Sequence, residues 1–166
     1  MLRILALALL LSGCAAPYDY AENTDFSQFD TVALSPEVDT NSLDGARITA
    51  AAQALLPGRG LMLSEPEQAS LWLSYQLDES VRVLSTMPNM FGQSRFWDEE
   101  RIYGTRREQH LTLLLTQPGS GKVLWKSRHP SAFPGENMHG AARRDKIRQQ
   151  VATLLENYPP PPSGEL

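Results

Sequence analysis

The chain is poor in residues that stabilise small proteins by covalent or metal cross-links. It has one cysteine, Cys14, and three histidines, His110, His129 and His139, among 166 residues. One cysteine cannot form a disulfide within the chain, and no histidine has a partner at metal-ligand spacing such as H-E-x-x-H. The sequence therefore predicts no structural zinc and places each histidine on the surface or in a loop.

Basic residues are also in deficit. Lysine and arginine number 15 against 19 acidic residues, which gives a formal net charge of -4. Proteins that bind nucleic acids in general carry a basic face. We therefore expect no nucleic-acid partner.

Catalytic motifs are missing as well. The run Gly119-Ser120-Gly121-Lys122 lacks the first glycine and the final Ser/Thr of a phosphate-binding loop. It lies between two expected strands, so we interpret it as a hairpin turn. The carboxylates at 98–100 are consecutive and do not face one another as an acid–base pair must. We predict no enzyme activity, no cofactor and no metal.

The longest apolar run, residues 4–11, is far shorter than the ~20 residues that cross a bilayer. With Arg3 before it and small residues after it, the run is typical of a secretory signal peptide, residues 1–13. LSGC at residues 11–14 resembles the bacterial lipobox, in which the cysteine thiol takes a diacylglycerol. The alternative is an ordinary signal peptide with a chance cysteine. We predict lipid attachment at Cys14, and Ala15 after it favours the outer membrane facing the periplasm.

Composition divides the exported chain into three parts. Residues 14–25 are polar and are expected to form the lipidated N-terminus and a tether. Residues 26–158 have the length of a single domain. The tail at 159–166, PPPPSGEL, cannot continue a helix and is expected to be disordered.

Periodicity within the domain predicts both helices and strands. Strands are expected at 29–34, 59–63, 70–77, 110–116 and 122–127, and helices at 40–56 and 138–158. Leu71, Leu73, Tyr75 and Leu77 share one face of their strand, which continues through Val81 and Val83. The order predicts an α+β fold, a mostly antiparallel sheet with two helices packed on one face.

Residues 84–107 lose this periodicity and are expected to form a long loop or hairpin tip. Their aromatic side chains stand among arginines, a composition that is enriched at protein-binding hot spots. The predicted partner contacts are Phe91, Phe96, Trp97, Arg101 and Tyr103. The alternative is that these aromatics fold back onto the domain's own sheet.

The last expected helix has a basic outer side. It carries Arg143, Arg144, Lys146 and Arg148. A solvated face is the simpler interpretation. Contact with anionic lipid or polymer is the alternative.

Five segments in order carry a family resemblance. They are residues 18–33 (YDY…DFSQFDTVA), 48–61 with GRGL at their end, 69–73 (ASLWL), 112–126 and 151–160 (VATLLENYPP). Together they resemble the bacterial lipoprotein family catalogued as domain of unknown function 4136. Three places depart from the family pattern: Gln109-His110-Leu111 replaces Gly-Thr-Leu, Ser70 replaces an aspartate, and the usual acidic residue of the hairpin strand is absent. The resemblance implies an α+β envelope lipoprotein and brings no enzyme activity.

These observations favour a membrane-anchored, non-catalytic binding or accessory module for an envelope protein partner. A carrier of a small apolar or lipid ligand is the alternative, because a sheet with a separable helix layer can open a cavity. An enzyme is the least favoured class, since no titratable residues cluster in the sequence.

Overall fold

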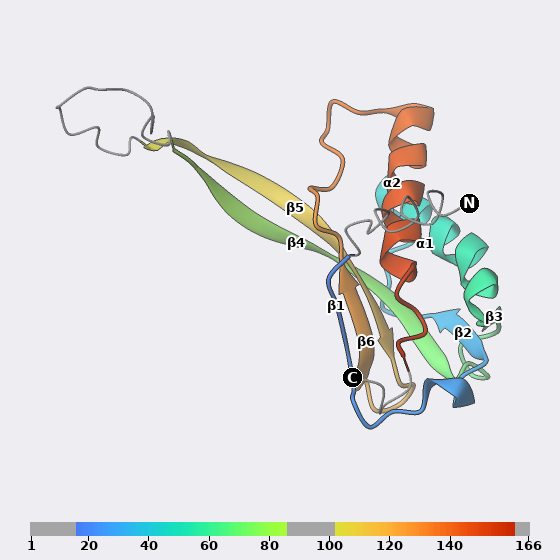
Figure 1. Cartoon of the computed structure of the whole chain (residues 1–166). Coiled ribbons are helices and arrows are strands. Elements are labelled where there is room, and N and C mark those ends of the chain that lie inside the picture. The colour runs from blue at the N-terminus through green and yellow to red at the C-terminus, as the bar shows by residue number, and fades with distance from the viewer. Residues whose placement is uncertain (1–15, 86–101, 162–166) are drawn as a thin grey trace, which may run out of the picture.

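The structure is a computed structural model that describes residues 16–85 and 102–161 (Figure 1). Its elements follow one another in the order β1 (Tyr18–Tyr20), η1 (Phe26–Gln28), β2 (Thr31–Leu34), α1 (Leu43–Leu55), η2 (Leu56–Arg59), β3 (Met62–Leu63), β4 (Leu71–Ser85), β5 (Ile102–Thr116), β6 (Val123–Arg128) and α2 (Gly140–Leu155). The α+β class is therefore confirmed.

The sheet is mixed, which corrects the expectation of a mostly antiparallel one. Its six strands lie in the order β1-β6-β5-β4-β2-β3. The pairs β1–β6, β6–β5 and β5–β4 are antiparallel, but β2 runs parallel to both β3 and β4. The reason is α1, which carries the chain back to the starting end of the sheet, so that the next strands run in the same direction as β2.

Both helices lie on the same side of the sheet (Figure 1). The face that alternation predicted is the buried one, because Leu71 and Leu73 of β4 are at most 3% exposed. Opposite them are apolar side chains of both helices, including Ile48 and Val151, which are also buried. Helix α1 begins after Ser42, one of the three expected caps, whose Oγ accepts a hydrogen bond from the Gly45 N–H at 3.1 Å.

A charged clamp joins the two helices. The Arg143 guanidinium of α2 donates two hydrogen bonds to the Asp44 carboxylate of α1, at 2.6 and 2.8 Å, and lies over the Phe133 ring. Its hydrogen bonds hold the pKa of Asp44 below its usual range. Arg143 therefore does not belong to the solvated basic face predicted for this helix, whereas Arg144, Lys146 and Arg148 are exposed.

The described part of the expected tether, from Ala16 on, belongs to the fold. Residues 18–20 form the edge strand β1 against β6. Ala16 is 1% exposed, and its carbonyl oxygen accepts a hydrogen bond from Asn157 at 2.9 Å. Pro17 is fixed through its carbonyl oxygen, which accepts from the Arg128 N–H at 3.0 Å. The polar sequence of this segment did not predict a strand, because the strand is held by backbone hydrogen bonds and not by an alternation of buried side chains.

The described part of the tail also packs onto the domain. Pro160 is buried, and residues 159–161 line one side of a surface groove whose other side is residues 23–27. Disorder was therefore the wrong prediction for residues 159–161. Residues 162–166 lie outside the described part of the chain.

Replacing Gly45 by alanine is expected to destabilise the protein, although alanine is the better helix former. A Cβ at this position would overlap the Asp39 carbonyl oxygen and lie 2.6 Å from the Tyr75 hydroxyl oxygen. The overlap involves backbone and costs about 1–3 kcal/mol, more than the ~1 kcal/mol gained in helix propensity. Thermal unfolding is expected to show a lower Tm for Gly45→Ala.

Gly58→Ala is the matched control, since a Cβ there meets nothing within 4 Å. Its Tm is expected to equal or exceed that of the unmodified chain. Equal Tm values for the Gly45→Ala and Gly58→Ala variants would contradict the close packing of the α1 N-terminus.

Candidate functional site

The first candidate surface is a two-stranded ribbon, residues 80–85 of β4 and 102–108 of β5. Strands β4 and β5 each have 15 residues and pair along their whole length. Their outer neighbours are short: β2 reaches only Leu71–Leu73, and β6 reaches Thr112. The His129 and Phe133 N–H groups still donate to the carbonyl oxygens of Leu111 and Gln109. Beyond Gln109, the described residues of the two strands have only each other as backbone hydrogen-bond partners, and the hairpin projects from the body (Figure 1).

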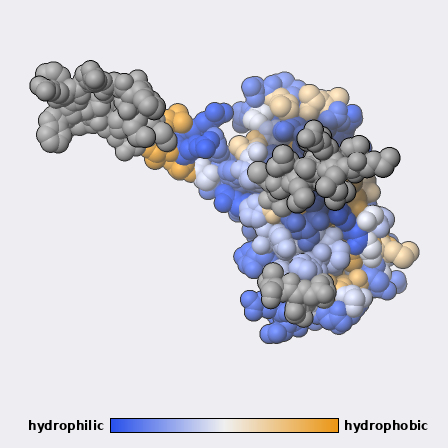
Figure 2. Space-filling view, in the orientation of Figure 1, coloured by the Kyte–Doolittle hydropathy of each residue, from blue (hydrophilic) through white to orange (hydrophobic). Residues whose placement is uncertain are grey.

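The ribbon carries apolar side chains that no other element covers. Val81 is 60% exposed, Val83 54% and Leu84 47%, and Figure 2 shows this apolar patch next to the grey tip. Val81 and Val83 lie on the same face of β4 as the residues that the helices cover nearer the start of the strand. An isolated two-stranded hairpin is at best marginally stable in water, and its unpaired edges can accept another strand.

Charged side chains lie between the apolar ones. Arg107 pairs with Glu79 at 3.4 Å and Arg106 with Glu108 at 3.7 Å. Both arginine side chains are at least 72% exposed, so these pairs contribute little to stability. Arg107 stands directly opposite Val81, so charged and apolar side chains share this face of the ribbon.

Part of the predicted contact loop is strand. Residues 84–85 and 102–107 belong to β4 and β5, because backbone pairing across the hairpin continues after the apolar–polar alternation stops. Of the predicted partner contacts, Tyr103 falls in β5. Phe91, Phe96, Trp97 and Arg101 lie outside the described residues, as does Cys14.

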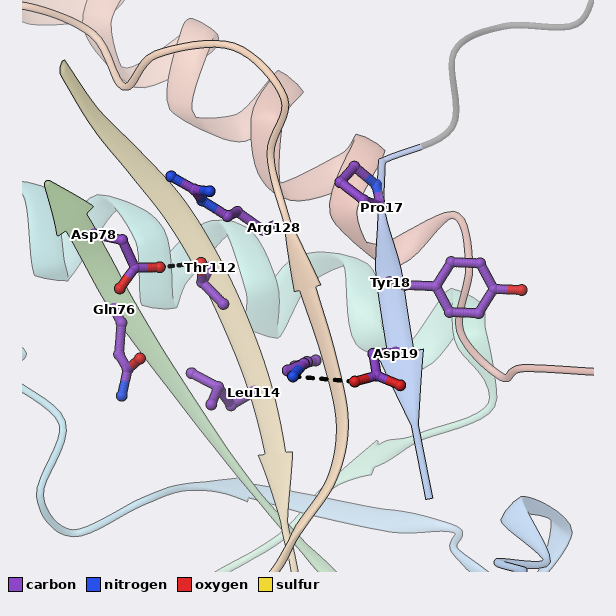
Figure 3. Close-up of a pocket in the computed structure, with 9 residues that line it drawn as sticks. Pro17, Tyr18, Asp19, Gln76, Asp78, Thr112, Leu114 and Arg128 are labelled. Atoms are coloured by element: carbon purple, nitrogen blue, oxygen red, sulfur yellow. Dashed lines mark hydrogen bonds and ion pairs between the residues drawn. The ribbon is translucent and has the colours of Figure 1, made fainter. Parts of the chain in front are cut away.

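The second candidate surface is an open groove on the sheet face that the helices leave uncovered (Figure 3). Its volume is about 460 Å³. Its lining includes Pro17, Asp19, Gln76, Asp78, Thr112, Lys126 and Arg128. They come from four strands or their ends, and sequence analysis did not bring them together. The signal was present in the polar positions of β4 and β6, which alternate with the buried ones.

Hydrogen bonds and ion pairs organise the charges in the groove. The Thr112 hydroxyl donates to Asp78 Oδ2 at 2.6 Å. Lys126 Nζ lies 3.0 Å from Asp19 Oδ2, and this hydrogen bond lowers the pKa of Asp19. Arg128 forms no ion pair with any described residue. In Figure 3 its side chain extends from β6 over β5, on the side where Asp78 meets Thr112.

Two histidines lie beside the base of the ribbon. His129 lies in the loop that follows β6, as predicted, although it is only 8% exposed, and the Ser131 N–H donates to its Nδ1 at 3.1 Å. Burial lowers the pKa of His129. His110 is half-buried and donates from Nδ1 to the His129 carbonyl oxygen at 3.0 Å. His139 is exposed, as predicted.

Three further features of the described residues bear on a metal site, a membrane span and a phosphate loop. No three of their His, Cys, Asp and Glu side chains are grouped to hold a metal, and none of their helices has the length and apolar character to span a membrane. Gln117 and Lys122 close the β5–β6 hairpin through a backbone hydrogen bond of 2.9 Å. The predicted hairpin turn, in place of a phosphate loop, is therefore confirmed.

The fold defines a small α+β domain with a one-sided helix layer and a projecting ribbon. The chain belongs to the family of domain of unknown function DUF4136, whose model matches residues 16–160. This match confirms the resemblance carried by the five sequence segments. No curated protein matches the chain.

One solved structure shows a related fold at low identity, and a second matches with a lower TM-score. A PDZ domain protein from Parabacteroides distasonis shares 15% identity with a TM-score of 0.55 over 89% of this chain, which spans only 36% of that protein. The PelC dodecamer from Paraburkholderia phytofirmans shares 15% identity with a TM-score of 0.44, covering 84% of this chain and 96% of that one.

Stability is expected to fall as the pH is lowered from 7 to 5, in part because of His129. Burial disfavours the imidazolium, so in this range the unfolded chain binds a proton that the folded chain does not. Stability is therefore lost as the pH falls through the ordinary histidine value of 6.5. Urea unfolding at pH 7, 6 and 5 measures this dependence.

The variant His129→Asn keeps a hydrogen-bond acceptor for the Ser131 N–H and cannot titrate. The substitution is expected to lower the free energy of unfolding by about 1 kcal/mol at pH 7. That free energy should then decline less steeply toward pH 5 than it does in the unmodified chain. His139→Asn, at an exposed position, is the matched control and should decline as the unmodified chain does. Parallel declines for all three proteins would contradict the role of His129 burial.

Proposed function

We propose that the chain is a lipid-anchored envelope protein that binds another envelope protein through its ribbon. Cys14 carries the lipid and holds the domain at the outer membrane, facing the periplasm. The role is non-catalytic: the domain recruits or positions a partner. The lipobox sequence and the family's lipoprotein character support the anchor, and the ribbon supports the binding role.

The uncovered apolar patch of the ribbon carries this proposal. Val81 and Val83 are more than half exposed, on a strand whose outer backbone edge has no sheet neighbour beyond Leu73 among the described residues. A partner strand can add to that edge by backbone hydrogen bonds while its side chains cover the valines. Burial of each valine would contribute on the order of 1 kcal/mol.

Anchoring strengthens this weak contact by raising the effective concentration of the domain near its partner. A lipid anchor confines the domain to the membrane surface, so a partner in the same membrane meets it far more often than in free solution. A ribbon with a modest apolar patch is then sufficient for a specific interaction. The charged residues beside the patch, Glu79 and Arg107, exclude partners of unsuitable charge.

The interface between the helix layer and the sheet does not support the carrier alternative. At that interface, the packing beside Ile48, Leu73 and Leu113 leaves no room for even a water molecule. A small apolar ligand has no enclosed space there.

Replacing both ribbon valines by threonine should weaken partner binding without unfolding the domain. The test is photo-cross-linking in intact envelopes with the full-length chain, followed by capture of the chain and mass spectrometry. Val81→Thr/Val83→Thr is expected to lower recovery of a specific partner about tenfold, which corresponds to ~1.4 kcal/mol. Val123→Thr, at a position 41% exposed in β6, should leave recovery unchanged.

Two further results separate the parts of the proposal. Cys14→Ser should abolish lipidation. Recovery of the partner should then fall only because the domain is no longer held at the membrane. Equal recovery from the ribbon variant and the Val123→Thr control would show that the ribbon is not the contact. A cross-linked species containing only this chain would identify a second copy as the occupant.

A further inference from the structure

The groove lies close to the point at which the chain is anchored. Ala16 is buried and Pro17 is hydrogen-bonded to β6, so Ala15 alone separates Cys14 from the folded domain. The chain can extend at most ~7 Å from Cys14 to Ala16, two residues on, and at most ~11 Å from Cys14 to Pro17, three residues on. Pro17, which lines the groove, is therefore within about 11 Å of the lipidated residue.

This distance places the groove against the membrane surface. The polar headgroup layer of a bilayer is roughly 5–8 Å thick on each side, given ~30 Å of hydrocarbon in a total of ~40–45 Å. Acyl chains on Cys14 enter the hydrocarbon, so Ala16 and Pro17 lie at the level of the headgroups or just outside it. The open sheet face beside Pro17 is then the surface available to those headgroups.

The charges in the groove are suited to a zwitterion. Asp19 is matched by Lys126 at 3.0 Å. The remaining two charges, Arg128 and Asp78, do not pair with each other, and the Thr112 hydroxyl lies on the Asp78 side at 2.6 Å. With two carboxylates, one lysine and one arginine, the groove has no formal net charge. An anionic ligand on Arg128 would also meet Asp78, whereas a zwitterion satisfies both.

We propose that this groove binds the headgroup of phosphatidylethanolamine. The Arg128 guanidinium donates to the phosphate, and the Asp78 carboxylate accepts hydrogen bonds from the ammonium group. Gln76 lines the same groove and adds a neutral donor and acceptor. The inference rests on the proposed lipid anchor, which supplies the proximity that so small a ligand needs.

Water-soluble headgroups test the recognition without a membrane. The mature chain, residues 14–166 with Cys14→Ser, is titrated with glycerophosphoethanolamine, glycerophosphocholine and glycerophosphoglycerol while backbone amide chemical shifts are recorded. Glycerophosphoethanolamine is expected to bind most tightly and to shift the amides of Thr112 and Arg128. Equal affinities for the three compounds, or tightest binding of glycerophosphoglycerol, would overturn the proposal.

Two substitutions assign the two charges. Arg128→Gln should weaken glycerophosphoethanolamine binding about tenfold. Asp78→Asn should weaken it similarly and reverse the preference in favour of the anionic glycerophosphoglycerol, because the carboxylate that excludes it has gone. Arg144→Gln and Asp145→Asn change the same charges in an exposed pair on α2 and should have no effect. A failure of Asp78→Asn to change the preference would remove Asp78 from the site.

Orientation on the membrane tests the placement. The acylated chain carries Ser74→Cys, on the same face of β4 as Gln76 and Asp78 but outside the groove lining, labelled with a fluorophore, in phosphatidylethanolamine-rich vesicles that contain a headgroup nitroxide lipid. The label should be strongly quenched, and a label at Gln149→Cys, exposed on α2 on the opposite face, should not. Intact-mass analysis reports acylation separately. An unacylated chain would overturn the proposed anchor, whereas an acylated chain quenched equally at both positions would overturn the groove proposal alone.

Discussion

A mismatch in length between strands and helices determines the shape of this domain. Strands β4 and β5 have 15 residues each and span about 50 Å, whereas the 16-residue α2 spans about 24 Å. The helix layer can therefore cover only about half of the hairpin. The covered half contributes the buried leucines of the core, and the uncovered half is the ribbon. The same alternation of side chains thus produces a core residue at Leu73 and an exposed one at Val83.

The one-sided helix layer has a second consequence, which is the open sheet face. Polar positions of β4 and β6, such as Asp78 and Arg128, point away from the helices and toward solvent or a surface (Figure 3). No second layer of the described residues covers them, so their charges keep access to ligands. The groove is thus a product of the alternation that builds the core, together with the β1 edge that brings Pro17 beside it.

The sequence predicted most elements through local signals and missed what depends on distant partners. Alternation identified the buried face of β4, and the Gly119–Lys122 run identified the β5–β6 turn. Residues 18–20 gave no strand signal, because their partners at 125–127 are more than a hundred residues away and the pairing uses backbone atoms. Arg143 looked like a surface residue because it is held by Asp44, a contact between two helices that tertiary packing creates. The ribbon extended beyond the predicted strand for the same reason.

Both proposed contacts lie at one end of the sheet. Arg128 pairs with Thr112 of β5 and donates to Pro17, and the ribbon begins at Glu108, four residues farther along β5, a distance of about 13 Å. An anchor at Cys14 therefore holds the base of the ribbon close to the membrane surface. A partner bound by the ribbon must then lie near that surface itself, either embedded in the same membrane or attached to it. The anchor thus restricts the ribbon to partners that a freely diffusing domain would rarely meet.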